Sequence, residues 1–213
     1  MVVGEDGNAA EPSPRLIAVL AAIDAANACD PTSIEVDGQR APAALVDGRR
    51  MSAVLARLAP DASEHLQIAV RGHHIARWTS PRQSYPAGRV GYLKWRRDLG
   101  AFHARRLAEI MTGAGYSPED SSRVGTLVRK EGLGSDPETQ MFEDVVCLVF
   151  LEHGLHDFMA KTDEDKLARI LAKTWRKMSE TGHQHALALG IPPAVHALLD
   201  RGLAALARPG SAA

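Results

Sequence analysis

Residues 138–158 read ETQMFEDVVCLVFLEHGLHDF and hold the most apolar run of the chain. Every position from Val145 to Leu151 is hydrophobic, so a helix here would be covered on all sides. A buried strand is the alternative for so short an apolar run, but the length of the whole segment and its flanking Glu, Gln and Met residues favour a helix. We therefore expect the central helix of the fold in this segment.

Further helical patterns precede and follow this segment. Ser13 and Pro14 supply an N-cap and a first-turn proline for one helix. Ser117 and Asp163 each begin a segment with acidic residues in its first turn. The remaining helices are expected from 48 or 49 to 58, from 61 or 63 through 78, over 92–111 and over 193–207, with a short extended piece at 33–36. The sequence predicts an all-α protein of about seven helices.

Length and composition indicate one globular domain. The chain has 213 residues, of which 45% are hydrophobic and 24% charged. A chain of this size can bury most of its apolar surface in a single core. We expect a single helical domain over 13–207, with flexible tails at 1–12 and 208–213. The two cysteines, Cys29 and Cys147, show no CxxC motif, so neither a disulfide framework nor a thiolate zinc site is supported.

Charge and hydropathy limit the partners. The formal net charge is -1, so no global basic field exists to attract nucleic acid, and a nucleic-acid contact would have to be local. No stretch reaches the roughly 18 consecutive apolar residues of a membrane span, and the N-terminal residues lack the pattern of a signal peptide. The sequence predicts a soluble cytoplasmic protein with a small anionic ligand and no membrane partner, and it leaves the oligomeric state open.

Residues 72–103 concentrate arginines and aromatic residues in a chain that is only 5% aromatic. Arginine binds phosphate or carboxylate through two parallel hydrogen bonds, and indole or phenol rings provide stacking surfaces. The predicted binding residues are Arg77, Trp78, Arg82, Tyr85, Arg89, Tyr92 and Trp95, with Arg96 placed to stabilise charge in a transition state. The alternative is structural, because arginines laid over aromatic rings can lock a long loop without any ligand.

A second set of residues could bind a metal ion. His73 or His74, His103, and Glu143 or Asp144 would lie on three helices, and imidazole and carboxylate ligands suit zinc, manganese or iron. An acidic pair leading into an apolar helix is costly unless a cation or hydrogen bonds meet it. The alternative is that the pair favours the start of its helix and forms an ion pair.

Of the two adjacent histidines, His74 is preferred, because on a helix it would share a face with Arg77 and Trp78. Other clusters are interpreted as structural. Glu152, His153, His156 and Asp157 fit a solvated surface, and His183 and His185 fit a polar turn.

Four segments resemble a known family when taken in order. They are RRMSAVLARLAP (49–60), LQIAVRGHHIARWTSPRQSYPAGRVGYLKWRRDLGAFHA (66–104), DPETQMFEDVVCLVFLEHGLHDF (136–158) and KTWRKMSETGHQHAL (173–187). They are similar to the bacterial and fungal proteins grouped as domain of unknown function family 4202, and the resemblance covers roughly residues 15 to 190. Members of that family have Gln-His-Ile where this chain has residues 73–75, which favours His74 as the functional histidine.

A more distant resemblance is to the HD-domain metal-dependent phosphohydrolases, which are helical. It implies that His103 and Asp144 match the separated histidine and late aspartate of that pattern. On this hypothesis His74, His103 and Asp144 hold a divalent transition metal, with Glu143 as a further ligand or a base, and the chain hydrolyses a small anionic substrate, with phosphorylated or nucleotide-like compounds as candidates. The alternative is a non-catalytic protein that binds a nucleotide, RNA or a metabolite in the arginine and aromatic pocket.

Overall fold

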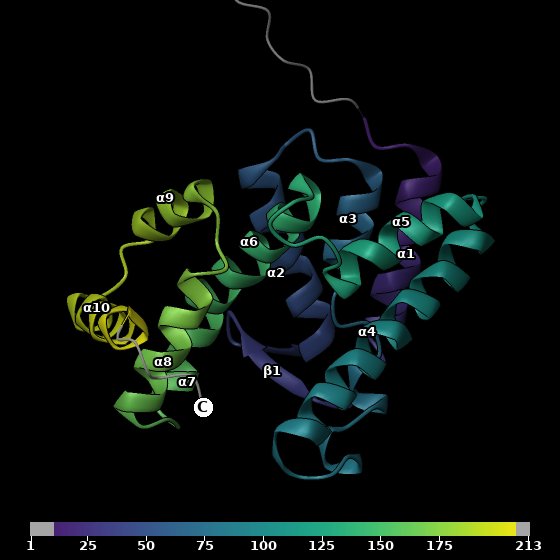
Figure 1. Cartoon of the computed structure of the whole chain (residues 1–213). Helices are drawn as coiled ribbons and strands as arrows, with labels where there is room; N and C mark the ends of the chain where they lie inside the picture. The colour runs from purple at the N-terminus through teal and green to yellow at the C-terminus, as the bar shows by residue number, and fades with distance from the viewer. Residues whose placement is uncertain (1–10, 208–213) are drawn as a thin grey trace, which may run out of the picture. The chain divides into compact units, whose positions relative to one another are not determined.

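The structure is a computed structural model that describes residues 11–207 (Figure 1). The chain divides into two compact units, an N-terminal unit within residues 1–131 and a C-terminal unit within residues 132–213. The single domain expected over 13–207 stays a prediction, and each unit is described by itself. The predicted tails fall largely outside the described residues.

The N-terminal unit holds five α-helices, one β-hairpin and two 3₁₀ turns within the residues described. Its helices are α1 (Pro14–Asn27), α2 (Ala43–Leu58), α3 (Glu64–Arg71), α4 (Gly88–Gly113) and α5 (Pro118–Arg129), its strands are β1 (Ser33–Val36) and β2 (Gln39–Pro42), and its 3₁₀ turns are η1 (Arg77–Thr79) and η2 (Arg82–Ser84). Helix α4 packs along α5, and α3 contacts α1, α2 and α5. The shared core of these helices includes Leu16, Ile23, Met51, Ile68, Leu107 and Leu127.

The two strands form an antiparallel hairpin with Val36 opposite Gln39. Asp37 and Gly38 make the turn with φ values of 51° and 76°. Two central residues with positive φ are typical of the tight hairpin turns whose twist matches that of the strands, and Asp-Gly is a preferred pair for them. The extended piece predicted at 33–36 is therefore β1, and its partner strand was missed.

The C-terminal unit contains five α-helices and one π-helical segment within the residues described. These elements are α6 (Pro137–Val149), the π segment η3 (Phe150–Gly154), α7 (Leu155–Met159), α8 (Glu164–Trp175), α9 (Glu180–Ala188) and α10 (Pro193–Ala207). Helices α8 and α10 pack closely at Gly202, where any side chain would collide: a Cβ there would lie only 2.1 Å from the carbonyl oxygen of Ala168. Their apolar cluster is formed by Leu155, Leu167, Leu171, Val195 and Leu199.

The mostly helical prediction is confirmed, but the described residues contain ten α-helices rather than about seven. The number of helices is higher in part because the apolar segment 138–158, predicted as one helix, contains a π segment between α6 and α7. Helix α9 adds to the number as well, since His183 and His185 lie on a helix and not in a polar turn. The HD-like fold stays a prediction.

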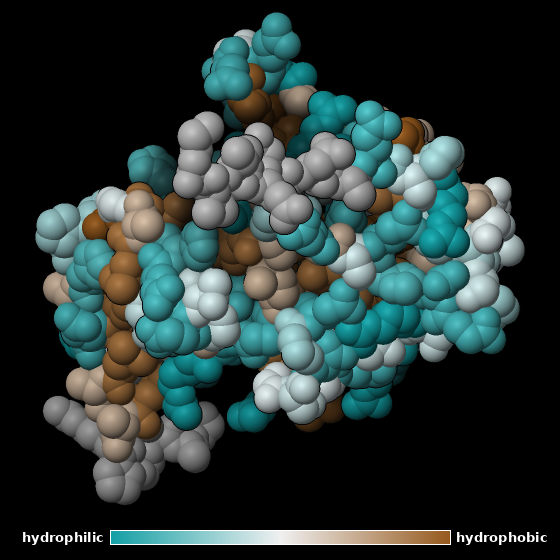
Figure 2. Space-filling view, turned by 90° about the horizontal axis from the view of Figure 1, so that it is seen from above, coloured by the Kyte–Doolittle hydropathy of each residue, from teal (hydrophilic) through white to brown (hydrophobic). Residues whose placement is uncertain are grey.

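Within the described part of the chain, no helix is both long and apolar enough to cross a membrane. On the face shown in Figure 2, hydrophilic residues predominate and apolar residues reach the surface in narrower strips.

Candidate functional site

The segment between α3 and α4 departs from the sequence prediction. We expected one helix to continue through residue 78, but α3 ends at Arg71 and Gly72 caps it. A Cβ on Gly72 would lie 2.4 Å from the Leu107 Cδ2 atom, so this position packs directly against α4. Ala76 then adopts the left-handed conformation, with φ 50° and ψ 28°, which costs a non-glycine residue about 1 kcal/mol or more. The chain therefore leaves the helix just before Arg77.

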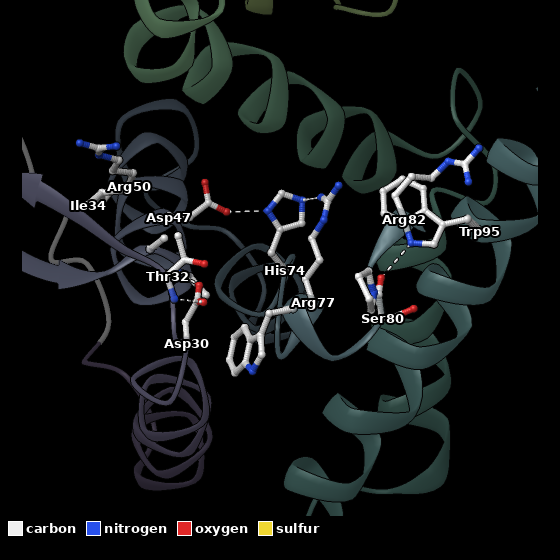
Figure 3. A pocket seen from close by; sticks show the side chains of 14 residues that line it. Asp30, Thr32, Ile34, Asp47, Arg50, His74, Arg77, Ser80, Arg82 and Trp95 are labelled. Atoms are coloured by element: carbon white, nitrogen blue, oxygen red, sulfur yellow. Dashed lines mark hydrogen bonds and ion pairs between the residues drawn. The ribbon is translucent and has the colours of Figure 1, made fainter. Parts of the chain in front are cut away.

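A pocket of about 540 Å³ lies beside this segment, entirely within the N-terminal unit. Its walls come from the loop before β1, from β1, from the first turns of α2, from residues 74–82 and from α4 (Figure 3). The lining residues are Asp30, Thr32, Ile34, Ala43, Ala44, Asp47, Arg50, His74, Arg77, Trp78, Ser80, Pro81, Arg82 and Trp95. Apolar and aromatic side chains form part of this wall, and it also carries two aspartates and three arginines.

Asp47, His74 and Arg77 form a hydrogen-bonded row along the pocket (Figure 3). The His74 Nδ1 atom lies 2.8 Å from Asp47 Oδ2, and the Arg77 Nη1 atom lies 2.6 Å from His74 Nε2. Because a guanidinium can only donate, His74 Nε2 is the acceptor and Nδ1 carries the proton that is donated to Asp47. His74 is therefore a neutral imidazole held in one tautomer.

The electrostatics of the row favour that neutral form. Burial lowers the pKa of His74, and the nearby Arg77 and Lys130 lower it further. The hydrogen bond from His74 to Asp47 acts in the opposite direction but does not cancel these effects. His74 is thus deprotonated near neutral pH and has the orienting carboxylate that a general base requires.

Arg77 is partly buried, and within residues 11–207 no carboxylate lies within ion-pair distance of it. Burial lowers the pKa of Arg77, and the positive charge of Arg96 lowers it further. Its guanidinium carbon lies 5.1 Å from the centre of the Trp95 ring. The negative charge of Asp47 raises the pKa of Arg77 but does not cancel these effects. A guanidinium that contacts a neutral imidazole and an indole, with a second arginine nearby, makes a local site for an anion.

Arg82 has a different role from Arg77 although both line the pocket. Its guanidinium donates to the carbonyl oxygens of Tyr85, Pro86 and Gly88 at 3.0, 2.9 and 3.3 Å. The same loop approaches α4 so closely that position 91 must be glycine, because a Cβ there would lie 1.9 Å from the Pro86 carbonyl oxygen. Arg82 therefore fixes the loop that leads into α4, as the structural alternative for these arginines proposes.

Trp95 is anchored by its own hydrogen bond, from Nε1 to the Ser80 carbonyl oxygen at 3.0 Å. Of the other predicted binding residues, Trp78 lines the pocket, whereas four lie outside its lining: Tyr85, Arg89, Tyr92 and Arg96. Tyr92 packs against Trp95 with ring centres 5.9 Å apart, and the Tyr85 ring lies under Lys94. Arg89 is exposed.

The three histidines of this region lie close together. The His73 ring stacks on His74 at 4.0 Å, and the His103 ring lies 6.4 Å from His74. His103 is buried, and its Nδ1 atom lies 2.9 Å from the Ile75 carbonyl oxygen, so Nδ1 donates. Burial lowers the pKa of His103 to about 3. Its Nε2 atom is buried and has no hydrogen-bond partner among the described residues.

The predicted metal ligands are placed as follows. His74 and His103 belong to the N-terminal unit and Asp144 to the C-terminal unit. Both ring nitrogens of His74 already make hydrogen bonds, which fits a ligand role poorly. Within residues 11–207, no group of three or more His, Cys, Asp or Glu side chains is arranged to hold a metal ion. The metal stays a prediction, and no step proposed below depends on it.

The acidic pair in α6 has structural contacts within its own unit. Asp144 accepts hydrogen bonds from the Ser179 backbone nitrogen and hydroxyl at 2.8 and 2.5 Å, and from Gln140 at 3.1 Å. Glu143 is buried beside Lys177, with 3.3 Å between Oε1 and Nζ. Both carboxylates thus find hydrogen-bonding or ionic partners, and Asp144 holds the residue that caps α9.

Sequence reasoning missed nine residues of the pocket lining, among them Asp30, Thr32, Asp47 and Arg50. Asp30 is structural, since its two carboxylate oxygens accept from the backbone nitrogens of Thr32 and Ala44. A signal for Asp47 existed in the sequence. It lies three residues after Ala44 and four before Met51, which are both buried, so it is a carboxylate on the apolar side of α2.

The model of one protein family matches residues 17–199 of this chain. That family is described as "Domain of unknown function (DUF4202)". No curated protein and no solved structure was found to match the chain.

Proposed function

The chain belongs to the DUF4202 family, and we propose that the pocket of its N-terminal unit binds a small phosphorylated or nucleotide-like anion. We further propose that the protein hydrolyses this anion. The observation that supports this most is Arg77: its guanidinium is partly buried, lies near a second arginine, and makes no ion pair with a carboxylate of residues 11–207. An anionic group at this point would replace the solvation that burial removes.

The rest of the pocket supports a ligand with a planar or apolar part. Two tryptophans, Trp78 and Trp95, and the side chain of Ile34 contribute to the wall. Indole rings bind flat groups such as nucleobases by stacking. A volume of about 540 Å³ suits a mononucleotide or a sugar phosphate rather than a polymer.

For the reaction, we propose that His74 serves as the general base and Asp47 as the group that orients it. His74 is neutral, and its Nδ1 proton is held by the carboxylate, so Nε2 would take a proton from the water as the water oxygen bonds to phosphorus. The ester P–O bond would break in the same reaction, and the proton on Nε2 would pass to the oxygen of the leaving alcohol. The cationic end of the pocket, Arg77 with Arg96 nearby, would stabilise the charge that develops on the anion. The non-catalytic alternative uses the same anion contacts without the base.

The first test is phosphate release from AMP and ribose 5-phosphate, measured with and without zinc, manganese and iron. His74→Gln should lower turnover about tenfold or more, since base catalysis typically contributes at least that factor. The matched control is His65→Gln, because His65 also contacts an aspartate, Asp120 at 2.7 Å, but lies outside the pocket. We expect this control to retain activity.

Equal loss of activity in the two variants would contradict the role of His74. Binding of the anion without any release of phosphate, under all metal conditions, would instead favour the non-catalytic alternative.

A further inference from the structure

The contact between Arg77 and His74 carries an inference that rests on the proposed function. We infer that Arg77 is an anion-responsive latch on His74: a bound anion draws the guanidinium away from the imidazole and thereby exposes the Nε2 atom of His74 to the substrate. The latch would couple occupation of the pocket to the availability of its base.

The geometry masks the base when the pocket holds no anion. A neutral imidazole has one acceptor lone pair, which lies in the ring plane on the unprotonated nitrogen. Arg77 Nη1 occupies that lone pair of His74 at 2.6 Å, while Asp47 holds the other nitrogen at 2.8 Å. Both ring nitrogens are therefore engaged, and neither can accept a hydrogen bond from a water or a substrate hydroxyl.

Arg77 has little to hold it on the imidazole once an anion arrives. It donates to a neutral ring nitrogen and lies against the face of Trp95, while the carboxylate of Asp47 attracts it from beyond ion-pair distance. A phosphate adds Coulomb attraction to the hydrogen bond of the guanidinium, which a neutral imidazole does not offer, and it can accept two such bonds at once. The positive charge of the nearby Arg96 favours a negative charge at this place, and the carboxylate of Asp47 opposes it. An anion is thus the stronger competitor for Arg77.

Two other arginines of the same unit show what a fixed arginine looks like. Arg71 makes two hydrogen bonds of 2.6 Å to the carboxylate of Asp24, and Arg82 donates to three backbone carbonyls. Arg77 has no comparable set of contacts. It also follows Ala76, whose left-handed backbone is a strained conformation of the kind that is concentrated at ligand clamps and switch regions.

The test is the ¹⁵N NMR signal of His74 Nε2 in full-length protein labelled at histidine, assigned with His74→Gln. Inorganic phosphate is the probe, and its binding is measured separately by calorimetry on the same samples. Saturating phosphate should move the Nε2 signal toward the value of a nitrogen that accepts no hydrogen bond from arginine. Arg77→Met should produce that displacement without phosphate, and phosphate should add no further displacement in this variant.

The matched control is Arg105→Met, which removes an exposed arginine of α4 that lies outside the pocket. Its Nε2 signal should start at the wild-type position and still move with phosphate. If Arg77→Met fails to fold, Arg77→Gln replaces it, since the shorter amide cannot reach the imidazole in the same way.

The outcomes separate the latch from the anion pocket. Phosphate that binds while the Nε2 signal stays in place would overturn the latch and leave the pocket intact. An unchanged Nε2 signal in ligand-free Arg77→Met would also overturn it. If calorimetry shows no binding of phosphate at all, the proposed function fails at its first step and the latch falls with it, because its trigger is absent.

Discussion

Asp144→Ala should lower the free energy of unfolding by about 4 kcal/mol, the cost expected when a buried, fully hydrogen-bonded carboxylate is removed. Asp144 is 1% exposed and accepts from Ser179 twice and from Gln140 once. Ser179 is the N-cap of α9, so the substitution both leaves buried donors without an acceptor and loosens the start of that helix. Denaturant unfolding of the full chain measures the effect.

The control for this prediction is Asp157→Ala, which removes an aspartate whose side chain is 82% exposed. It should change stability by less than about 0.5 kcal/mol. A loss below about 1 kcal/mol in Asp144→Ala would contradict the structural role described here. If Asp144→Ala also released a bound metal, the metal hypothesis for this residue would gain support.

Acidification from about pH 7 to about pH 4 should remove about 3 kcal/mol of stability through His103 alone. The pKa of His103 in the folded protein is about 3, compared with 6.5 when the ring is free of the fold. Between these two values the unfolded chain binds a proton that the folded chain does not. Stability is therefore complete above about pH 6.5 and declines as the pH falls toward 3.

This pH dependence can be assigned to His103 by substitution. His103→Gln removes the titrating ring, so its stability should vary less steeply between about pH 7 and about pH 4 than that of the wild type, even if the variant is less stable at neutral pH. His156→Gln is the control, because the His156 side chain is 98% exposed. Parallel pH profiles for wild type and His103→Gln would show that the ring is not held neutral by burial.

Local signals explain which parts of the fold could be predicted from the sequence. Ser13, Ser117 and Asp163 each cap a helix through contacts that span only three residues, and all three starts are confirmed. The last helix begins at Pro193, where its apolar spacing predicts, and continues through Ala207, the last residue described. In each case the residues that determine the element lie inside it or directly beside it.

Features that depend on distant contacts or on backbone strain were missed. The stop of α3 at Arg71 involves the close approach of Gly72 to Leu107 and the left-handed Ala76, and no local composition signals either one. The π segment after Val149 lies in a uniformly apolar run that gives no break signal.

The candidate site was predictable only in part, because some of its residues are brought together by contacts between distant segments. The sequence pointed to His74 and Arg77, which do lie in the pocket wall. It placed Asp47 on the apolar side of its helix but could not pair it with His74, which is 27 residues further along the chain. It also could not distinguish Arg77 from Arg82, because their roles depend on the path of the loop between them and α4.

The central claim, that Arg77 makes this pocket an anion site, is tested most directly by the dissociation constant of AMP for the wild type and for Arg77→Met, measured by calorimetry. Loss of a charge-assisted hydrogen bond to phosphate should weaken binding about thirtyfold, or about 2 kcal/mol. Arg105→Met, which removes an exposed arginine of α4 outside the pocket, should bind AMP like the wild type. Equal affinities for AMP in the wild type and Arg77→Met would contradict the claim.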